Sequence, residues 1–208
     1  MSLKHFMLDL ETVAIRTRAA PLSCALVPFD LHSDEPMPLP ASENAFPNCH
    51  WFIDTQECLD NGMRADMSTL DWWFKQSPAV RSWAFAEQHR RVFSINSFCQ
   101  NFNACLNTST RNCTEKDIRL WVRNVKFDIP ILEHLYEVAG KKFPFRHDAV
   151  RCCYTLLETG LGSISVSAFK ETHPEYPLVD QAHNPVMDCW NQIQMLRAAK
   201  RSILNEKI

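Results

Sequence analysis

The sequence predicts one α/β domain with a central mixed β-sheet flanked by α-helices. Strands are expected first, and helices then alternate with strands along the rest of the chain, an order typical of this class. The chain has 208 residues, 46% of them hydrophobic, which is enough for one well-buried core and too little for two. We therefore expect residues 1–208 to form a single domain.

Three strands are expected in the first quarter of the chain. Residues 4–11 alternate, so that Asp9 and Glu11 share one face of a strand whose other face is apolar. Two further apolar runs indicate strands, and a stretch rich in proline and acidic residues between them indicates a surface loop. These strands cover residues 22–29 and 50–54, and the loop covers residues 30–48.

The middle of the chain is expected to be mainly helical. Residues 68–71, Ser-Thr-Leu-Asp, match the capping-box pattern that opens a helix. Ser77 and Pro78 begin a second helical segment, and residues 94–107 carry apolar side chains at helical spacing. Residues 118–122 form a short apolar run that predicts a buried strand.

Two helices are expected in the last part of the chain. Apolar residues recur at helical spacing over residues 128–139, and Gly140 is a typical stop signal. Asn184 followed by Pro185 predicts an N-cap with proline at the first helical position. The helix that they open is expected to bury Trp190, Ile193 and Leu196 and to end in Arg197, Lys200 and Arg201.

Composition excludes several classes of protein. The formal net charge is −2 and the isoelectric point is near 6.4, so a uniformly basic surface for nucleic acid is excluded, although a local patch is not. The nine cysteines are odd in number and include no Cys-x-x-Cys pair, so we expect reduced thiols of a cytoplasmic protein. No apolar segment is long enough to span a bilayer, and acids interrupt the N-terminus too early for a signal peptide. No membrane partner is expected.

Asp9 and Glu11 lie two positions apart on the first expected strand, so both carboxylates point to one face. Adjacent carboxylates repel each other unless a cation lies between them, and Mg²⁺ prefers carboxylate oxygen. Asp-x-Glu is nevertheless a common pattern. A solvated strand face is the simpler explanation for this pair taken alone.

Three other polar residues indicate a functional site only when they are considered together. Asp128 lies at the expected start of a helix, where aspartate is a preferred N-cap. His183 precedes the last expected helix, and Asp188 lies in its second turn. Taken separately, each is explained as well by a cap or a surface position.

Three motifs occur in order along the chain: Asp-x-Glu-Thr at 9–12, Asn-x-x-Phe-Asp at 124–128 and His-x-x-x-x-Asp at 183–188. Together they resemble the motifs of the DEDDh exonuclease superfamily, which implies a ribonuclease H-like fold. Residues 68–78 resemble a segment of a narrower group of phage and prophage exonucleases. That group includes the phage T4 DexA-like proteins, small proteins often labelled exodeoxyribonuclease VIII, and the mycobacterial exoribonuclease-like domain.

The resemblance implies a role for each residue of the motifs. Asp9, Glu11 and Asp188 would bind the metal ion that carries the attacking water, and Asp9 and Asp128 would hold a second ion near the leaving oxygen. The expected cofactors are two Mg²⁺ or Mn²⁺ ions, which at roughly 4 Å separation suit in-line displacement at a phosphodiester. His183 would take the proton from the water, because an imidazole with a pKa of ~6.5 can be neutral at physiological pH.

The relatives also imply substrate contacts close to the first two motifs. Thr12 and Val13 follow the first motif, at a turn that touches the terminal nucleotide in relatives. Asn124, in the second motif, is a further candidate substrate-binding residue. Phe127 is a candidate wedge beside a terminal base, although a phenylalanine before a helix more often belongs to the core.

Four other residues are expected near the substrate strand. Trp72 and Trp73 are adjacent and point to different sides of a helix, so one is expected in the core. The other would offer a stacking face to a base or line the cleft. Arg64 and Arg151 are candidate phosphate ligands by analogy with the group, with ordinary surface positions as the alternative.

The sequence departs from its relatives at two places. Asn124 is flanked by Arg123 and Val125, where close relatives often carry glycine, and these larger side chains bear on how the substrate strand approaches. Met187 stands where relatives often carry an acid. Neither change removes an expected metal ligand.

The leading hypothesis is a hydrolase that acts on single-stranded 3′ ends and releases nucleoside 5′-monophosphates, with DNA slightly favoured over RNA. The alternative is a catalytically inactive module of the same fold that binds nucleic-acid ends or a host protein. The presence of all five expected site residues argues against this alternative. A polymerase-bound proofreading subunit is a third hypothesis, disfavoured because such subunits normally carry an extra binding tail. The oligomeric state, a homodimer included, stays open.

Overall fold

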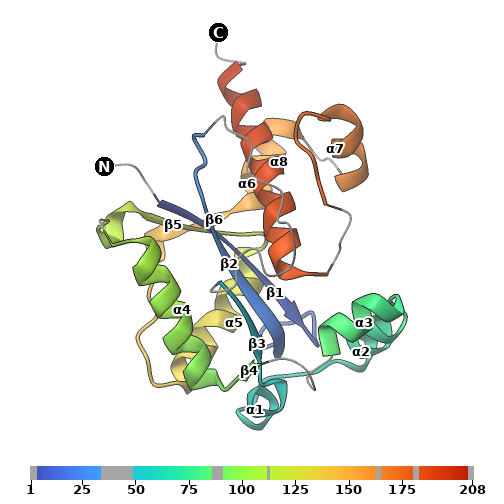
Figure 1. The fold of residues 1–208 in the computed structure, drawn as a ribbon, viewed down its shortest axis with the longest axis vertical. Helices are drawn as coiled ribbons and strands as arrows, with labels where there is room; N and C mark the ends of the chain where they lie inside the picture. Colours follow the sequence, from blue (N-terminus) through green and yellow to red (C-terminus); the bar gives the residue numbers. More distant parts are fainter. Residues whose placement is uncertain are drawn as a thin grey trace.

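A mixed sheet of six strands, in the order β4-β3-β2-β1-β5-β6, runs through the molecule (Figure 1). The computed structural model describes residues 4–33, 49–85, 91–111, 113–162, 165–179 and 183–205. The strands are β1 (Lys4–Thr12), β2 (Pro21–Phe29), β3 (His50–Ile53), β4 (Val92–Phe93), β5 (Ile118–Val122) and β6 (Val150–Cys152).

Strand β1 lies inside the sheet, between β2 and β5. It pairs antiparallel with β2 and parallel with β5. β2 also pairs antiparallel with β3, whereas the outer pairs β3–β4 and β5–β6 are parallel. Because β1 is hydrogen-bonded on both edges, its side chains are fixed in direction along most of its length. The predicted mixed sheet is confirmed.

Helices cover both faces of this sheet. Figure 1 shows α4 and α5 on one face, α6 and α8 on the other, and α2 and α3 beside the end of β1. The helices are α1 (Thr55–Asp60), α2 (Met67–Phe74), α3 (Pro78–Phe85), α4 (Ile95–Ser109), α5 (Val125–Val138), α6 (Cys153–Leu161), α7 (Val166–Thr172) and α8 (Pro185–Asn205).

The two faces of β1 belong to two separate cores, as the alternation in residues 4–11 predicts. Phe6 and Leu8 are fully buried in the larger core, together with apolar residues of α4 and α5. Met7 points the other way and is buried with Ile193 and Leu196 of α8. The sheet therefore fixes the direction of every second side chain of β1, including the two acids near its end.

Several predicted helix boundaries are wrong. α2 begins at Met67 with Asp66 as its N-cap, so Ser68 does not cap it. The start is fixed by tertiary contact, because the backbone N–H of Asp66 donates to the carbonyl oxygen of Val13 at 2.9 Å. α8 continues past the predicted basic end to Asn205.

α5 also begins earlier than predicted. Its first residue is Val125, and the side chain of Asn124 caps it by accepting from the backbone N–H of Lys126 at 3.1 Å. Asp128 therefore lies within the first turn and is not a cap. The helices α1, α6 and α7 and the strands β4 and β6 were not predicted. Most of the predicted loop, residues 34–48, lies outside the described residues.

Within the described ranges, the structure contains no helix that is both long enough and apolar enough to cross a membrane.

Candidate active site

The end of β1 carries two acidic side chains into the site. Asp9 and Glu11 lie on the same face of the strand, and Glu11 is only 8% exposed. The regular pairing with β2 breaks between Glu11 and Thr12. An irregularity of this kind bends a strand and redirects its side chains, and here it follows directly after the two acids.

Asp128 reaches the same site from the first turn of α5. Its Oδ2 accepts a hydrogen bond of 3.1 Å from the backbone N–H of Asn124, and its side chain is 5% exposed. The amino-terminal end of a helix carries a partial positive charge, which favours a carboxylate there. Local structure therefore holds Asp128 in a single direction before any ligand binds.

The start of α8 supplies the other two residues. Asn184 caps the helix by accepting from the backbone N–H of Val186 at 3.0 Å, and Asp188 lies in the first turn, not the predicted second. The backbone N–H of His183 donates to Asp188 Oδ2 at 3.2 Å. His183 has a φ of 63°, a conformation that is strained for a residue with a side chain and that often occurs at functional sites.

The five expected catalytic residues, Asp9, Glu11, Asp128, His183 and Asp188, all line one cavity. Within it, ligand atoms of Glu11, His183 and Asp188 all lie within 4.8 Å of one another. Asp9 and Asp128 adjoin this group, since the charges of Asp188, Glu11 and Asp128 all act on the Asp9 carboxyl. The structure thus brings together residues from β1, α5 and the start of α8, as the motif order predicts.

Burial raises the pKa of every carboxyl in this cluster, and the charges of neighbouring acids raise it further at Asp9 and Glu11. Burial is the main cause for Asp9 and Glu11, whose pKa values rise well above the ordinary range, and the charge of Asp188 comes next. Burial also raises the pKa of Asp128 and of Asp188 to about 6. Four such carboxyls ionise together only with a counter-charge, and their hard oxygen atoms fit a divalent cation such as Mg²⁺.

Two tryptophans of α2 enclose the His183 ring. The ring centroid of Trp72 lies 4.7 Å from that of His183, and the centroid of Trp73 lies 5.7 Å away, both with steeply inclined rings. Trp73 is 1% exposed and donates from Nε1 to the carbonyl oxygen of Thr12 at 2.9 Å, whereas Trp72 is 41% exposed. Burial lowers the pKa of His183, which favours the neutral imidazole that a general base requires.

The cavity has a volume of about 930 Å³, within the usual range for ligand sites. Besides the acidic cluster, most of its lining residues come from α5, α6, α7 and α8. The wall residues include Arg123, Asn124, Phe127, Tyr154, Glu158, Val166, Lys170 and Gln192.

Some of the predicted substrate-binding residues line this cavity, and others do not. Asn124 and Phe127 line it. Thr12 and Val13 are buried outside its lining, and the Thr12 hydroxyl donates inward to the carbonyl oxygen of Ala14 at 2.6 Å. Trp72 and Trp73 contact His183 without lining the cavity itself.

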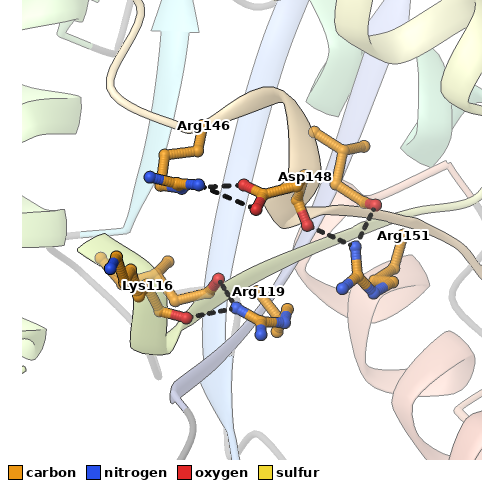
Figure 2. A network of polar contacts seen from close by, with 7 residues as sticks. Lys116, Arg119, Arg146, Asp148 and Arg151 are labelled. Carbon is orange, nitrogen blue, oxygen red and sulfur yellow. Dashed lines mark hydrogen bonds and ion pairs between the residues drawn. The ribbon is translucent and has the colours of Figure 1, made fainter. Parts of the chain in front are cut away.

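The two arginines predicted as phosphate ligands also lie outside the lining. Arg151 donates from Nη1 to the carbonyl oxygens of Asp148 at 2.7 Å and Val150 at 2.8 Å. Figure 2 shows this contact, and a similar one for Arg119 on β5. Arg64 is exposed. Neither Arg64 nor Arg151 belongs to the site described here.

Sequence reasoning missed Gln192 and Tyr154. Gln192 donates from Nε2 to Asp9 Oδ1 at 2.9 Å. It follows Asp188 by four residues on α8, so helical spacing is a signal that could have identified it. Tyr154 lines the cavity and contacts Arg123, which lies 31 positions away. No local pattern indicates a contact of that kind.

A family model described as the 3′-5′ exoribonuclease Rv2179c-like domain matches residues 4–200, nearly the whole chain. The chain belongs to this family. The description of this family names a 3′-5′ exoribonuclease, and the predicted resemblance to 3′→5′ exonucleases is confirmed. A comparison with curated proteins gave no match.

Two nucleases of known structure share the fold. Cell-death related nuclease 4 (CRN-4) aligns with a TM-score of 0.57 at 12% identity, over 96% of this chain and 64% of that one. Exonuclease I of E. coli, in complex with a dA16 oligonucleotide, aligns with a TM-score of 0.55 at 13% identity, over 97% and 41% of the two chains. The chain thus spans less than two thirds of either nuclease. The likeness confirms the expected ribonuclease H-like fold.

Proposed function

We propose that this chain is a DEDDh-type 3′→5′ exonuclease that hydrolyses single-stranded DNA or RNA to nucleoside 5′-monophosphates. One observation carries the proposal. Asp9, Glu11, Asp128, His183 and Asp188 come from three distant parts of the chain and line one cavity. The family supports the 3′→5′ polarity, and the motif order supports the DEDDh assignment.

The donor set supports a pair of divalent cations. Asp9, Glu11 and Asp188 would hold one Mg²⁺ or Mn²⁺ ion, and Asp9 with Asp128 would hold the other. When bound, such a pair stabilises both the entering and the leaving oxygen of a phosphodiester displacement. The raised pKa values of the four carboxyls support this assignment, because burial disfavours their charged forms and a bound cation would stabilise them.

The rest of the reaction depends on groups that the chain already holds in place. His183 would take the proton of the attacking water on a ring nitrogen, and burial, which lowers its pKa, favours the neutral ring. Backbone N–H groups fix Asp128 and Asp188, and Gln192 fixes Asp9. Each carboxylate therefore enters the reaction already directed, which reduces the cost of ordering the site.

End-labelled single strands test the proposal directly. Labelled DNA and RNA oligonucleotides of one sequence would be incubated with Mg²⁺, and the products resolved by length and identified as nucleotides. We expect progressive shortening from the 3′ end with release of 5′-monophosphates. A bulky block on the 3′-hydroxyl should slow the reaction, whereas a block on the 5′ end should not.

Three outcomes would contradict the proposal. Cuts within a circular single strand would show an endonuclease. Hydrolysis that persists in EDTA would exclude the divalent-cation assignment. Tight, metal-independent binding of single strands with no hydrolysis of either polymer would favour the inactive binding module of the same fold.

A further inference from the structure

Arg123 brings a fixed positive charge to the edge of the acidic cluster. It directly follows β5, and its exposed side chain lines the cavity beside that of Tyr154. Burial alone would lower the pKa of its guanidinium, but Tyr154 and the charges of Asp9 and Asp188 raise it. The group is therefore a permanent cation next to the predicted reaction centre.

Tyr154, and not a carboxylate, holds this guanidinium. Arg123 Nε donates to the Tyr154 hydroxyl at 2.9 Å, and the guanidinium carbon lies 5.4 Å from the centre of the tyrosine ring. Among the described residues, Arg123 forms no ion pair, and its two terminal nitrogens form no hydrogen bond. Four of its five N–H donors are thus open to an acceptor that enters the cavity.

Few other charged residues line the cavity. Apart from the four carboxylates of the acidic cluster, they are Arg123 and Lys170, which are positive, and Glu158, which is negative. A phosphodiester carries a single negative charge, which the open donors of the Arg123 guanidinium complement.

The position of the guanidinium relates it to a particular phosphate. Arg123 adjoins Asn124, whose backbone N–H donates to Asp128 Oδ2, and it lines the same cavity as Asp128 and Asp188, so it lies close to the cluster. It forms no ion pair with either residue, so it lies beside the cluster and not within it. The phosphate that is cut belongs over the metal-binding carboxylates, and the guanidinium would then face the next phosphate of the strand.

We infer that Arg123, positioned by Tyr154, binds the phosphodiester immediately 5′ of the one that is cut. This inference rests on the proposed exonuclease activity. It adds that the substrate strand carries a second phosphodiester linkage, 5′ of the one that is cut, for Arg123 to bind. The planar fork of a guanidinium matches two oxygens of one phosphate, and such charge-assisted bonds are among the stronger hydrogen bonds. A contact to a non-reacting phosphate strengthens binding of substrate and transition state equally, so its loss should raise KM more than it lowers kcat.

Two trinucleotides that differ in one charge provide the test. Both have an ordinary 3′-terminal linkage, and one carries an uncharged methylphosphonate at the linkage 5′ of it. Release of the 3′-terminal nucleotide would be measured with Mg²⁺ for the wild-type protein, Arg123→Gln and a matched control, Arg119→Gln. Arg119 lies on β5, the strand that Arg123 follows, but its guanidinium bonds to local carbonyl oxygens outside the cavity (Figure 2).

The wild-type protein and Arg119→Gln should lose roughly 10- to 100-fold in kcat/KM on the methylphosphonate, mainly through KM. Arg123→Gln should cut the two trinucleotides at similar rates, because the contact that senses the charge is gone. If Arg123→Gln keeps the wild-type preference, the inference is wrong, although the nuclease proposal stands. A wild-type chain that cuts neither trinucleotide overturns the nuclease proposal itself.

The variant Tyr154→Phe tests whether Tyr154 positions Arg123, because it leaves the positive charge of Arg123 in place. It keeps the ring and removes the hydroxyl that accepts from Arg123 Nε. We expect a preference for the charged linkage that is weaker than in the wild-type protein and stronger than in Arg123→Gln. A preference equal to that of the wild-type protein would show that Tyr154 does not position Arg123.

Discussion

Gln192 on α8 donates a hydrogen bond of 2.9 Å to Asp9 on β1, across 183 positions of the sequence. Gln192 is 8% exposed, and its Oε1 is buried without a partner among the described residues. Nε2 thus has a carboxylate oxygen as its acceptor, and Gln192 is one of the residues that line the cavity. The amide fixes the direction of the carboxylate that we assign to both metal ions.

Gln192→Leu should weaken metal binding and slow hydrolysis, because loss of a residue that orients a metal ligand typically costs 10–100-fold. Calorimetric titration with Mn²⁺ would give the affinity, and labelled oligonucleotides the rate. Gln56→Leu is the control, since Gln56 is an exposed glutamine of α1. Equal Mn²⁺ affinity of Gln192→Leu and the wild-type protein would show that the hydrogen bond does not orient a metal ligand.

Asp9→Ala should abolish hydrolysis and leave the fold intact. Burial and the neighbouring acids raise the pKa of Asp9, so removal of its carboxyl relieves repulsion in the metal-free protein. The melting temperature without metal should therefore hold or rise. Asp71→Ala, at an exposed position of α2, is the control and should keep full activity. Near-normal activity of Asp9→Ala would exclude the two-metal mechanism.

The metal-free protein should become less stable as the pH rises through about 6. Burial raises the pKa of Asp128 from 3.8 to about 6, so the folded protein favours the protonated carboxyl. The stability that this preference contributes is complete below the pKa of the unfolded chain. It is lost as the pH rises through the pKa of the folded protein. For this carboxyl the loss is about 3 kcal/mol. Urea unfolding at a series of pH values should show the decline, and Mn²⁺ should reverse it.

Asp128→Asn provides the control for this titration, because an amide does not ionise. The variant should lose less stability over the same pH interval than the wild-type protein. A metal-free wild-type protein whose stability is constant between about pH 4 and 8 would show that the cluster carries no such strain.

The sequence indicated the direction of the acids more reliably than the helix boundaries. In β1 the period of two is unambiguous, because Phe6 and Leu8 must face one core and Met7 the other. Asn184 and Pro185 likewise fix the start of α8 by local chemistry. At α2, Ser68 and Asp66 are both plausible caps within one turn. A tertiary bond from Asp66 to Val13 decides between them.

The walls of the cavity were harder to predict, because they depend on packing between distant segments. The sequence marks Arg123 only as a departure from the glycine that relatives often carry. Its contact with Tyr154 requires the start of α6 to lie beside the end of β5, which β6 brings about by pairing with β5. No periodicity in the sequence reports that pairing.

Gly160→Ala should destabilise the protein although alanine is the better helix former. A Cβ at Gly160 in α6 would lie 2.3 Å from the carbonyl oxygen of Ala199 in α8, so the two helix backbones would have to separate. Overpacking typically costs 1–3 kcal/mol, against roughly 1 kcal/mol gained in helix propensity. Urea unfolding of Gly160→Ala would measure the net change. Thr159→Ala, at an exposed neighbour on α6, should show no comparable loss.

His183 has two possible roles, and the geometry sharpens the choice between them. Its ring lies within 4.8 Å of ligand atoms of Glu11 and Asp188, which is close enough for a metal ligand. Burial lowers its pKa, which suits a general base. We assign the base, and so expect a hydrolysis rate that rises with pH through the neutral region and then flattens in the wild-type protein.

His183→Ala should lower kcat by roughly 10²–10⁴-fold, the usual contribution of a positioned base, and should leave the Mn²⁺ affinity nearly unchanged. Asp188→Ala should lose both activity and Mn²⁺ affinity, because its carboxylate is assigned as a ligand. Calorimetric Mn²⁺ titrations of the two variants separate the roles, with His173→Ala as a control for loss of a histidine outside the cavity lining. If His183→Ala loses as much metal affinity as Asp188→Ala, His183 is a ligand, and the base must be sought elsewhere in the cavity.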